Sequence, residues 1–209
     1  ITLNTATITN VSCNGGNNGS ITASQTGGSG TISYVWSNGA NTATASNLVV
    51  GSYSVTATDQ AGCSVSATYA VSQPSAITIN SPTITNVSCN GGNNGSINNL
   101  SATGGTGFIS YTWSNGQTGA NATNLVAGSY TVTAKDANNC TATASYTITQ
   151  PTAITISAPT ISNVTCNGGN NGSLANISAS GGTGAFTFTW SNGQVGSSAT
   201  TLVAGTYTV

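Results

Sequence analysis

The stretch Thr31-Ile32-Ser33-Tyr34-Val35-Trp36-Ser37-Asn38-Gly39 combines a period-two pattern with a turn signal. Alternation places Ile32, Tyr34 and Trp36 on one face of an extended chain, which is typical of a half-buried β-strand. The Asn-Gly pair predicts a tight turn, because glycine adopts the positive φ that such turns need. The pattern returns at 109–116 and 186–193. We therefore expect the same strand and turn three times.

The stretch belongs to a tandem repeat with a period near 77 residues. Cys13, Cys89 and Cys166 each open a Cys-Asn-Gly-Gly-Asn-Asn-Gly-Ser sequence, and they are spaced 76 and 77 residues apart. We place three domains, repeat 1 at 1–76, repeat 2 at 77–153 and repeat 3 at 154–209, and expect the third to be incomplete and to lack its last strand. A unit copied this closely is typical of a protein that spans distance or presents one surface many times.

Other segments of each repeat also alternate. We expect strands at Ser20–Ser24, Ser52–Thr58 and Ser64–Val71, separated by Gly-rich and Asp-containing turns. Six or seven short strands per repeat predict an all-β fold, a tandem array of small antiparallel immunoglobulin-like β-sandwich domains. Tyr53 follows Gly51-Ser52 at the entry to a late strand, which fits either a tyrosine corner or a tyrosine that simply fills the core.

Charge is almost absent from the chain. Lys135, Asp59 and Asp136 are its only charged side chains, so charged residues make up 1% of the sequence against about 25% in an ordinary soluble domain. We expect no nucleic-acid partner, since phosphate binding needs Lys and Arg, and no direct membrane insertion. Without His or Glu, serine has no general base, so we expect no enzyme activity, no catalytic residues and no cofactor.

The five cysteines favour an oxidising, extracellular compartment. Two pairings respect the repeat. One joins Cys13 to Cys63 and Cys89 to Cys140 within repeats and leaves Cys166 with a partner outside the chain, and the other joins consecutive repeats through Cys63–Cys89 and Cys140–Cys166. Counting four strands between Cys13 and Cys63 returns both to the same end of a domain, so we expect the structural disulfides Cys13–Cys63 and Cys89–Cys140, one per complete repeat.

Three further features have two interpretations each. Asp59 and Asp136 fit turn-forming residues better than Ca²⁺ ligands, because one carboxylate per repeat is little support for this ion, and we expect no metal site. Trp36, Trp113 and Trp190 share a face with core residues, so packing is favoured over stacking on sugars. The Asn/Gly loops either contact surfaces or simply need left-handed backbone. The candidate contact residues are Asn14, Asn17, Asn18, Asn90, Asn93, Asn94, Asn167, Asn170 and Asn171.

The combination of motifs resembles the SprB repeat. The residues that carry the resemblance are Cys13 to Ser20, Gly104 to Gly107, Trp113 to Gly116, Ala127 to Asp136 and Thr147 to Pro151. The resemblance implies a β-sandwich repeat of very large adhesins on gliding bacteria. It also implies export by the type IX secretion route through a C-terminal signal outside these 209 residues, and roles in gliding, attachment or filament formation.

We therefore expect a structural and adhesive segment of an extracellular, cell-surface protein or filament. Its expected partners are polysaccharide or solid surfaces, with lateral self-association of chains into fibres as a further interaction. The alternative from a different class is a carbohydrate-binding module array with one glycan site in each repeat.

Overall fold

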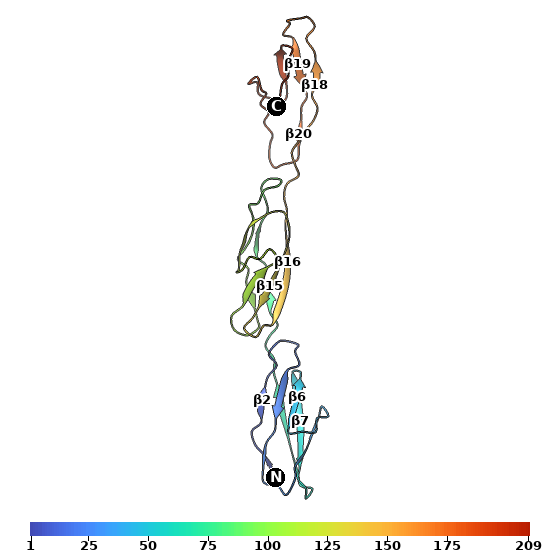
Figure 1. The fold of residues 1–209 in the computed structure, drawn as a ribbon, viewed down its shortest axis with the longest axis vertical. Coiled ribbons are helices and arrows are strands. Elements are labelled where there is room, and N and C mark those ends of the chain that lie inside the picture. Colours follow the sequence, from blue (N-terminus) through green and yellow to red (C-terminus); the bar gives the residue numbers. More distant parts are fainter. The chain divides into compact units, whose positions relative to one another are not determined.

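The computed structural model describes residues 1–209, and every regular element in it is a β-strand (Figure 1). Repeat 1 contains β1 (Thr2–Leu3), β2 (Thr7–Thr9), β3 (Gly19–Thr22), β4 (Gln25–Thr26), β5 (Ser33–Trp36), β6 (Thr44–Leu48), β7 (Gly51–Thr58) and β8 (Ser64–Val71). Repeat 2 contains β9 (Thr78–Ile79), β10 (Thr83–Thr85), β11 (Gly95–Asn98), β12 (Ala102–Thr103), β13 (Ser110–Trp113), β14 (Ala122–Leu125), β15 (Gly128–Lys135) and β16 (Thr141–Ile148). Repeat 3 contains β17 (Thr155–Ile156), β18 (Thr160–Ser162), β19 (Gly172–Ala175), β20 (Ala179–Ser180) and β21 (Ala199–Leu202).

The chain divides into two compact units, and their boundary passes through repeat 2. One unit comprises Ile1–Thr83, Asn98–Ala122 and Tyr130–Tyr146, and the other comprises Ile84–Ile97, Thr123–Ser129 and Thr147–Val209. The first unit thus holds all of repeat 1 together with the start of repeat 2, its middle segment Asn98–Ala122 and the segment around Cys140. The second unit holds all of repeat 3.

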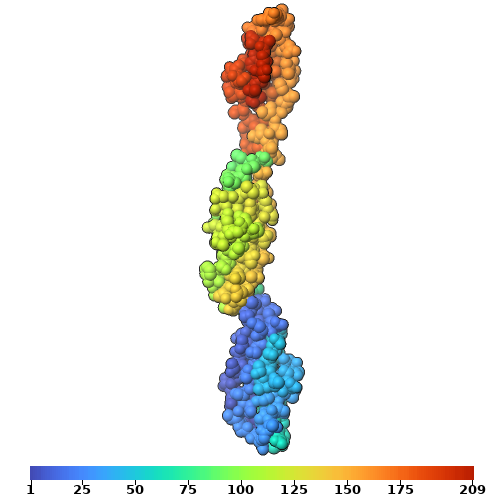
Figure 2. Space-filling view, viewed as in Figure 1, coloured from blue at the N-terminus to red at the C-terminus, as the bar shows by residue number.

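Repeat 1 is built from two three-stranded antiparallel sheets, β2-β3-β6 and β5-β7-β8, with β1 and β4 forming a short separate pair. Ile21 and Leu48 from the first sheet and Trp36 and Val55 from the second belong to one buried cluster. The cluster forms because alternate residues of each strand point to the same side. In the space-filling view the blue and cyan residues of repeat 1 form one continuous body (Figure 2).

The predicted alternation is confirmed in β5. Tyr34 and Trp36 are buried while Ser33 and Val35 are exposed. The indole N–H of Trp36 donates to the carbonyl of Thr42 at 2.9 Å, so the one polar atom of this buried ring has a partner. Trp113 and Trp190 are buried in the same way, and their N–H groups donate to Gly119 and Gly196 at 3.0 Å. The interpretation of the tryptophans as core residues is therefore confirmed.

The Asn38-Gly39 turn is tight but does not join two strands of one sheet. Gly39 has φ 86°, and its N–H donates to Trp36. The strand before the turn, β5, pairs with β7, while the strand after it, β6, pairs with β3. The chain thus crosses from one sheet to the other at this turn.

As a result, β5 and β6 run in the same direction. Gly19, Leu48 and Val71 lie together at one end of repeat 1, because the Leu48 carbonyl and the Val71 side chain stand directly beside Gly19. At the other end, Ser33 lies opposite Thr58 at the start of β5. The chain folds back locally at the turn, where the Ala40 carbonyl accepts from the Trp36 N–H. Its net path from Ser33 to Leu48 nevertheless leads from one end of the repeat to the other.

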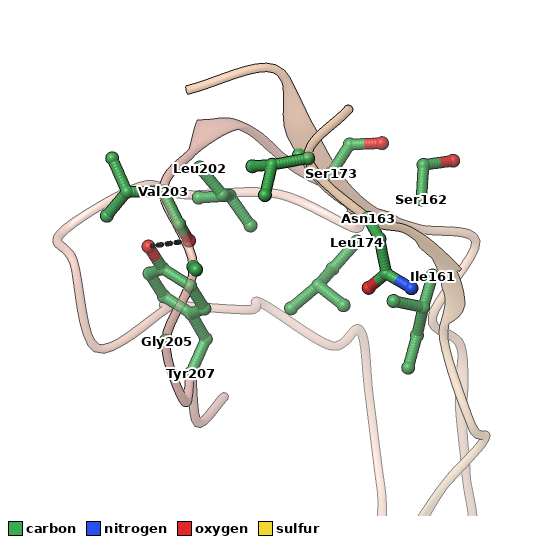
Figure 3. Close-up of a pocket in the computed structure, with 12 residues that line it drawn as sticks. Ile161, Ser162, Asn163, Ser173, Leu174, Leu202, Val203, Gly205 and Tyr207 are labelled. Carbon is green, nitrogen blue, oxygen red and sulfur yellow. Dashed lines mark hydrogen bonds between the residues drawn. The ribbon is translucent and has the colours of Figure 1, made fainter. Parts of the chain in front are cut away.

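Repeat 3 has two sheets, β18-β19-β21 and the pair β17-β20. Ile177, Trp190, Ala199 and Leu202 form its buried cluster. A hollow of 280 Å³ lies beside Leu174, Leu202 and Tyr207 (Figure 3). In the same figure the Tyr207 hydroxyl donates to the Val203 carbonyl at 3.1 Å. The Tyr53 hydroxyl donates to the Val49 carbonyl at 3.0 Å in the same way. The backbone contact expected of a tyrosine corner is therefore present in repeats 1 and 3.

Candidate functional site

The Asn/Gly loop of repeat 1 is fixed by its own asparagine. The Asn18 side chain accepts from the Ser12 N–H at 3.0 Å and donates to the Ser12 hydroxyl at 2.8 Å. Gly15 takes φ 74°, a left-handed conformation that glycine adopts without steric cost. These interactions hold the backbone on both sides of Cys13.

The same loop contacts the linker that leads into repeat 2. The Asn14 side chain donates to the Pro74 carbonyl at 3.1 Å, and the Gly15 N–H donates to the side-chain oxygen of Gln73 at 2.8 Å. Cys13 is therefore held at the end of repeat 1 where the chain passes into repeat 2.

A buried aspartate organises the facing turn of repeat 2. Asp136 is 4% exposed, and its two carboxylate oxygens accept backbone N–H bonds from Thr106 at 2.8 Å, and from Asn138 and Cys140 at 2.9 Å. Burial raises the pKa of Asp136, but these three N–H donors outweigh it and hold the pKa below its ordinary value. The predicted turn-forming role is confirmed, and it places Cys140 directly after the turn.

Asp59 does the same in repeat 1. It accepts from the backbone N–H groups of Ser29 and Cys63, at 3.1 and 2.9 Å. The bond from Ser29 is the main cause that lowers the pKa of Asp59 below its usual range. In both repeats, one carboxylate therefore ties the Gly-rich loop to the turn that carries a cysteine.

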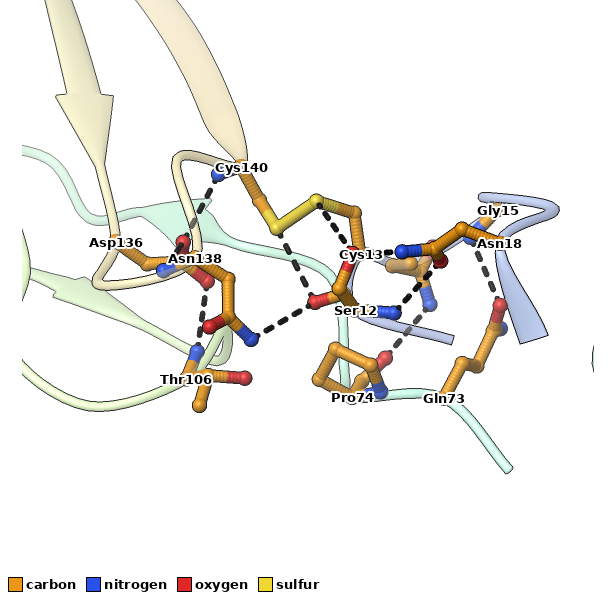
Figure 4. Close-up of a disulfide and its surroundings, with 11 residues drawn as sticks. Ser12, Cys13, Gly15, Asn18, Gln73, Pro74, Thr106, Asp136, Asn138 and Cys140 are labelled. Carbon is orange, nitrogen blue, oxygen red and sulfur yellow. Dashed lines mark hydrogen bonds between the residues drawn. A yellow bond between two sulfur atoms is a disulfide. The ribbon is translucent and has the colours of Figure 1, made fainter. Parts of the chain in front are cut away.

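A disulfide joins the two facing elements. Cys13 is bonded to Cys140, with their Cα atoms 5.5 Å apart and a sequence separation of 127 residues (Figure 4). The Asn138 side chain donates to the Ser12 carbonyl at 3.2 Å beside the bond. The junction of repeats 1 and 2 is thus crossed by the peptide linker, by a covalent sulfur bond and by side-chain hydrogen bonds.

This finding corrects the expected pairings Cys13–Cys63 and Cys89–Cys140. Because β5 and β6 run in the same direction, the chain crosses repeat 1 three times rather than four between the two cysteines. Cys13 follows Val11, which bonds Ser72 beside the linker, whereas Cys63 is held by Asp59 at the other end. The expected pairing assumed that the chain reverses direction at every strand between Cys13 and Cys63. This assumption is wrong for β5 and β6, which run in the same direction on either side of the turn after Trp36.

Cys63, Cys89 and Cys166 are free and exposed. Within the second unit, the loop of Cys89 repeats the arrangement found around Cys13. Asn90 donates to the Pro151 carbonyl at 3.0 Å, and Gly91 donates to Gln150 at 2.8 Å. A hollow of 390 Å³ beside Cys89 is lined by Ile154 and Gly182. The loop geometry therefore exists without a disulfide.

The predicted contact asparagines fall into two groups. Asn18, Asn94 and Asn171 bond the residue before the loop cysteine, and Asn14 and Asn90 bond the linker. Their amides are occupied in shaping the loop. Asn17, Asn93 and Asn170 are exposed on the same loops, and Asn167 is also exposed. The structure supports the turn interpretation for the first group and leaves the second facing solvent.

Sequence reasoning missed the linker residues at this site. The signal was the recurrence of Gln73-Pro74 as Gln150-Pro151. The glutamine follows the last strand of each repeat, and its side-chain oxygen accepts from the loop glycine. Lys135, the only basic side chain of the sequence, is exposed. No helix in the structure has the length and apolar character needed to cross a membrane.

These features define a class: a tandem-repeat, all-β chain with a disulfide between neighbouring repeats. Three segments, residues 5–41, 81–118 and 158–195, match the family model of the SprB repeat, one in each repeat. Together they cover more than half of the chain, which belongs to the SprB repeat family. No curated protein matches the chain. Repeats of this family are associated with cell-surface adhesins of gliding bacteria, a general association that fits a repeated structural unit.

Proposed function

We propose that this chain is a structural and adhesive segment of an extracellular surface protein or filament, used for attachment and gliding. Membership of the SprB repeat family carries the proposal. The proposed contacts are hydrogen bonds and van der Waals contact with polysaccharide or solid surfaces, and the same neutral surface suits lateral association of chains into fibres.

The surface chemistry of the repeats supports this proposal. An exposed asparagine stands at the same position of each Asn/Gly loop, at Asn17, Asn93 and Asn170. Hydroxyls also line the outer faces of the sheets, where Thr56 bonds Ser66 and Thr131 bonds Ser145 at 2.8 Å. Such groups bond neutral ligands without any charge, so salt does not screen the contact.

Bead attachment tests the proposal. Beads coated with the chain are placed under flow on glass and on polysaccharide films, first in dilute buffer and then in about 1 M NaCl, where exposed charges are strongly screened. We expect attachment to persist in salt and to fall when Asn17, Asn93 and Asn170 are all replaced by Ala. Detachment by salt alone contradicts the proposed contact chemistry. Beads coated with an unrelated neutral protein are the control.

A second candidate function is a carbohydrate-binding module, and one observation favours it in repeat 2. Phe108 is 82% exposed and lines a hollow of 900 Å³ together with Ile109 and Tyr111. An exposed aromatic ring beside hydroxyls is suited to a sugar face. The equivalent residues are Thr31 in repeat 1 and Ala185 in repeat 3, so this feature favours one site in the chain over one site in each repeat.

Glycan titration separates the two functions. Saturable binding that is lost in Phe108→Ala, and retained in the control Val195→Ala at a residue of similar exposure, favours the module. Attachment without saturable binding favours the structural and adhesive role.

We also propose that each complete repeat is an immunoglobulin-like sandwich. The two facing sheets of repeat 1 and the bond from Tyr53 to Val49 support this assignment. An experimental structure of the chain tests it through the order of strands in each sheet.

A further inference from the structure

We infer that the Cys13–Cys140 disulfide is a tension-bearing link that carries a pulling force past the folded residues 14–139. The inference goes beyond surface attachment, and it holds whether or not the chain adheres. It rests on the covalent connectivity of the chain and on the positions of the two cysteines.

The first step is the covalent path between the termini. A force applied at residues 1 and 209 enters along residues 1–13, crosses the sulfur bond and leaves along 140–209. Residues 14–139 form a closed loop attached at one point of this path. Once the path is taut, tension does not stretch the loop, because its two ends are already joined.

The second step is what the loop contains. Strands β3 to β8 of repeat 1 and β9 to β15 of repeat 2 all lie inside it. The linker through Gln73 and Pro74 lies inside it as well. Without the disulfide, that linker is the only covalent connection between the two repeats, and every strand on either side of it is exposed to the applied force.

The third step is that the fold presents the two cysteines to each other independently of the bond. Asn18 fixes the backbone before Cys13, and Asp136 fixes the N–H of Cys140. Asn138 reaches across to Ser12, and Asn14 reaches to Pro74. The hydrogen bonds of these four side chains therefore hold Cys13 and Cys140 close together at the junction, so the fold itself favours a disulfide between the repeats.

The length protected by the bond is large. A separation of 127 residues corresponds to about 420–460 Å of extended chain. A pairing of Cys13 with Cys63 would protect only 50 residues, or roughly 165–180 Å. The two pairings are therefore distinguishable by contour length alone.

Single-molecule force spectroscopy tests the inference on the whole chain. The chain is held through tags at both termini that do not use thiols, in a background where Cys63, Cys89 and Cys166 are replaced by Ser to prevent exchange. Oxidised molecules are expected to release only residues 1–13 and 140–209. Cys13→Ser is expected to release about 420–460 Å more.

The control is a molecule that is already folded and oxidised. Adding a reductant to it during the measurement is expected to produce the same gain, which keeps the test valid if Cys13→Ser folds poorly. Equal released lengths before and after reduction overturn the inference. A gain near 165–180 Å on reduction of the natural sequence, with all five cysteines, also overturns it, because that length belongs to the Cys13–Cys63 pairing.

Discussion

The Asn18 side chain forms two hydrogen bonds with Ser12: it accepts from the backbone N–H at 3.0 Å and donates to the hydroxyl at 2.8 Å. The pair recurs as Asn94 with Ser88 and as Asn171 with Thr165. The residue held in each pair directly precedes the loop cysteine, so this contact sets the direction in which the cysteine leaves the loop.

Asn18→Ala is expected to lower the stability of repeat 1 by about 1 kcal/mol, the usual net value of a hydrogen bond. It is also expected to slow the formation of the disulfide from the reduced chain, since Cys13 is no longer positioned. Urea unfolding and timed thiol trapping measure the two effects. Asn17→Ala on the same loop is the matched control, and an equal loss in both variants contradicts the role given to Asn18.

The disulfide itself is open to direct mapping. Digestion of the unreduced, alkylated protein should yield one cross-linked peptide pair containing Cys13 and Cys140, with Cys63, Cys89 and Cys166 alkylated. Mass spectrometry identifies the pair. Recovery of Cys13 linked to Cys63 is the result that the structure forbids, because these residues lie at opposite ends of repeat 1.

Trp36→Ala is expected to destabilise repeat 1 by about 3–5 kcal/mol, the range for removing a large aromatic side chain from a core. Trp36 is 2% exposed, whereas its neighbour Val35 is 64% exposed. Val35→Ala is therefore the control and should change stability by less than about 0.5 kcal/mol. Thermal unfolding followed by tryptophan fluorescence is not suitable for the Trp variant, so far-ultraviolet circular dichroism is the measurement. Similar losses in both variants would contradict the assigned faces of β5.

The stability of the fold should depend on pH only under acidic conditions. The pKa values of Asp59 and Asp136 lie below the ordinary 3.8 because their carboxylates accept backbone N–H bonds. A lowered pKa stabilises the folded state at pH values above 3.8, and this stabilisation is lost as the pH falls through the folded-state value. The unfolding temperature should be level from about pH 5 to 8 and fall below about pH 4.

The double variant Asp59→Asn, Asp136→Asn provides the control for this prediction. It is expected to have a lower unfolding temperature at neutral pH and a much weaker dependence on acid. An unchanged acid transition in the double variant would show that other groups cause it.

Much of the fold was predictable because the long strands alternate. β5 and β7 bury every second residue, and β7 contributes Val55 and Ala57 to the core as expected. β6 was harder to recognise because its buried residues, Ala45 and Leu48, are three apart. Asn47, with φ 56°, inserts a bulge opposite β3 and breaks the alternation.

The disulfide was not predictable in the same way. Its position depends on the directions of β5 and β6, which local sequence does not encode. An Asn-Gly pair predicts a tight turn equally well when the chain continues in the same sheet and when it crosses to the facing one. The residues of the site were visible as repeated motifs, but their pairing depended on tertiary connectivity.

The three chain crossings between Cys13 and Cys63 also give repeat 1 a polarity. Cys13 lies at the end of the repeat that leads into repeat 2, and Cys63 lies at the opposite end. A disulfide of the Cys13–Cys140 kind therefore forms only when repeats follow one another head to tail. Two repeats that met in opposite orientations would bring two Asn/Gly loops together and leave the cysteines of the Asp-containing turns without a partner. A single crossover turn after a tryptophan thereby sets the direction in which such units can be chained.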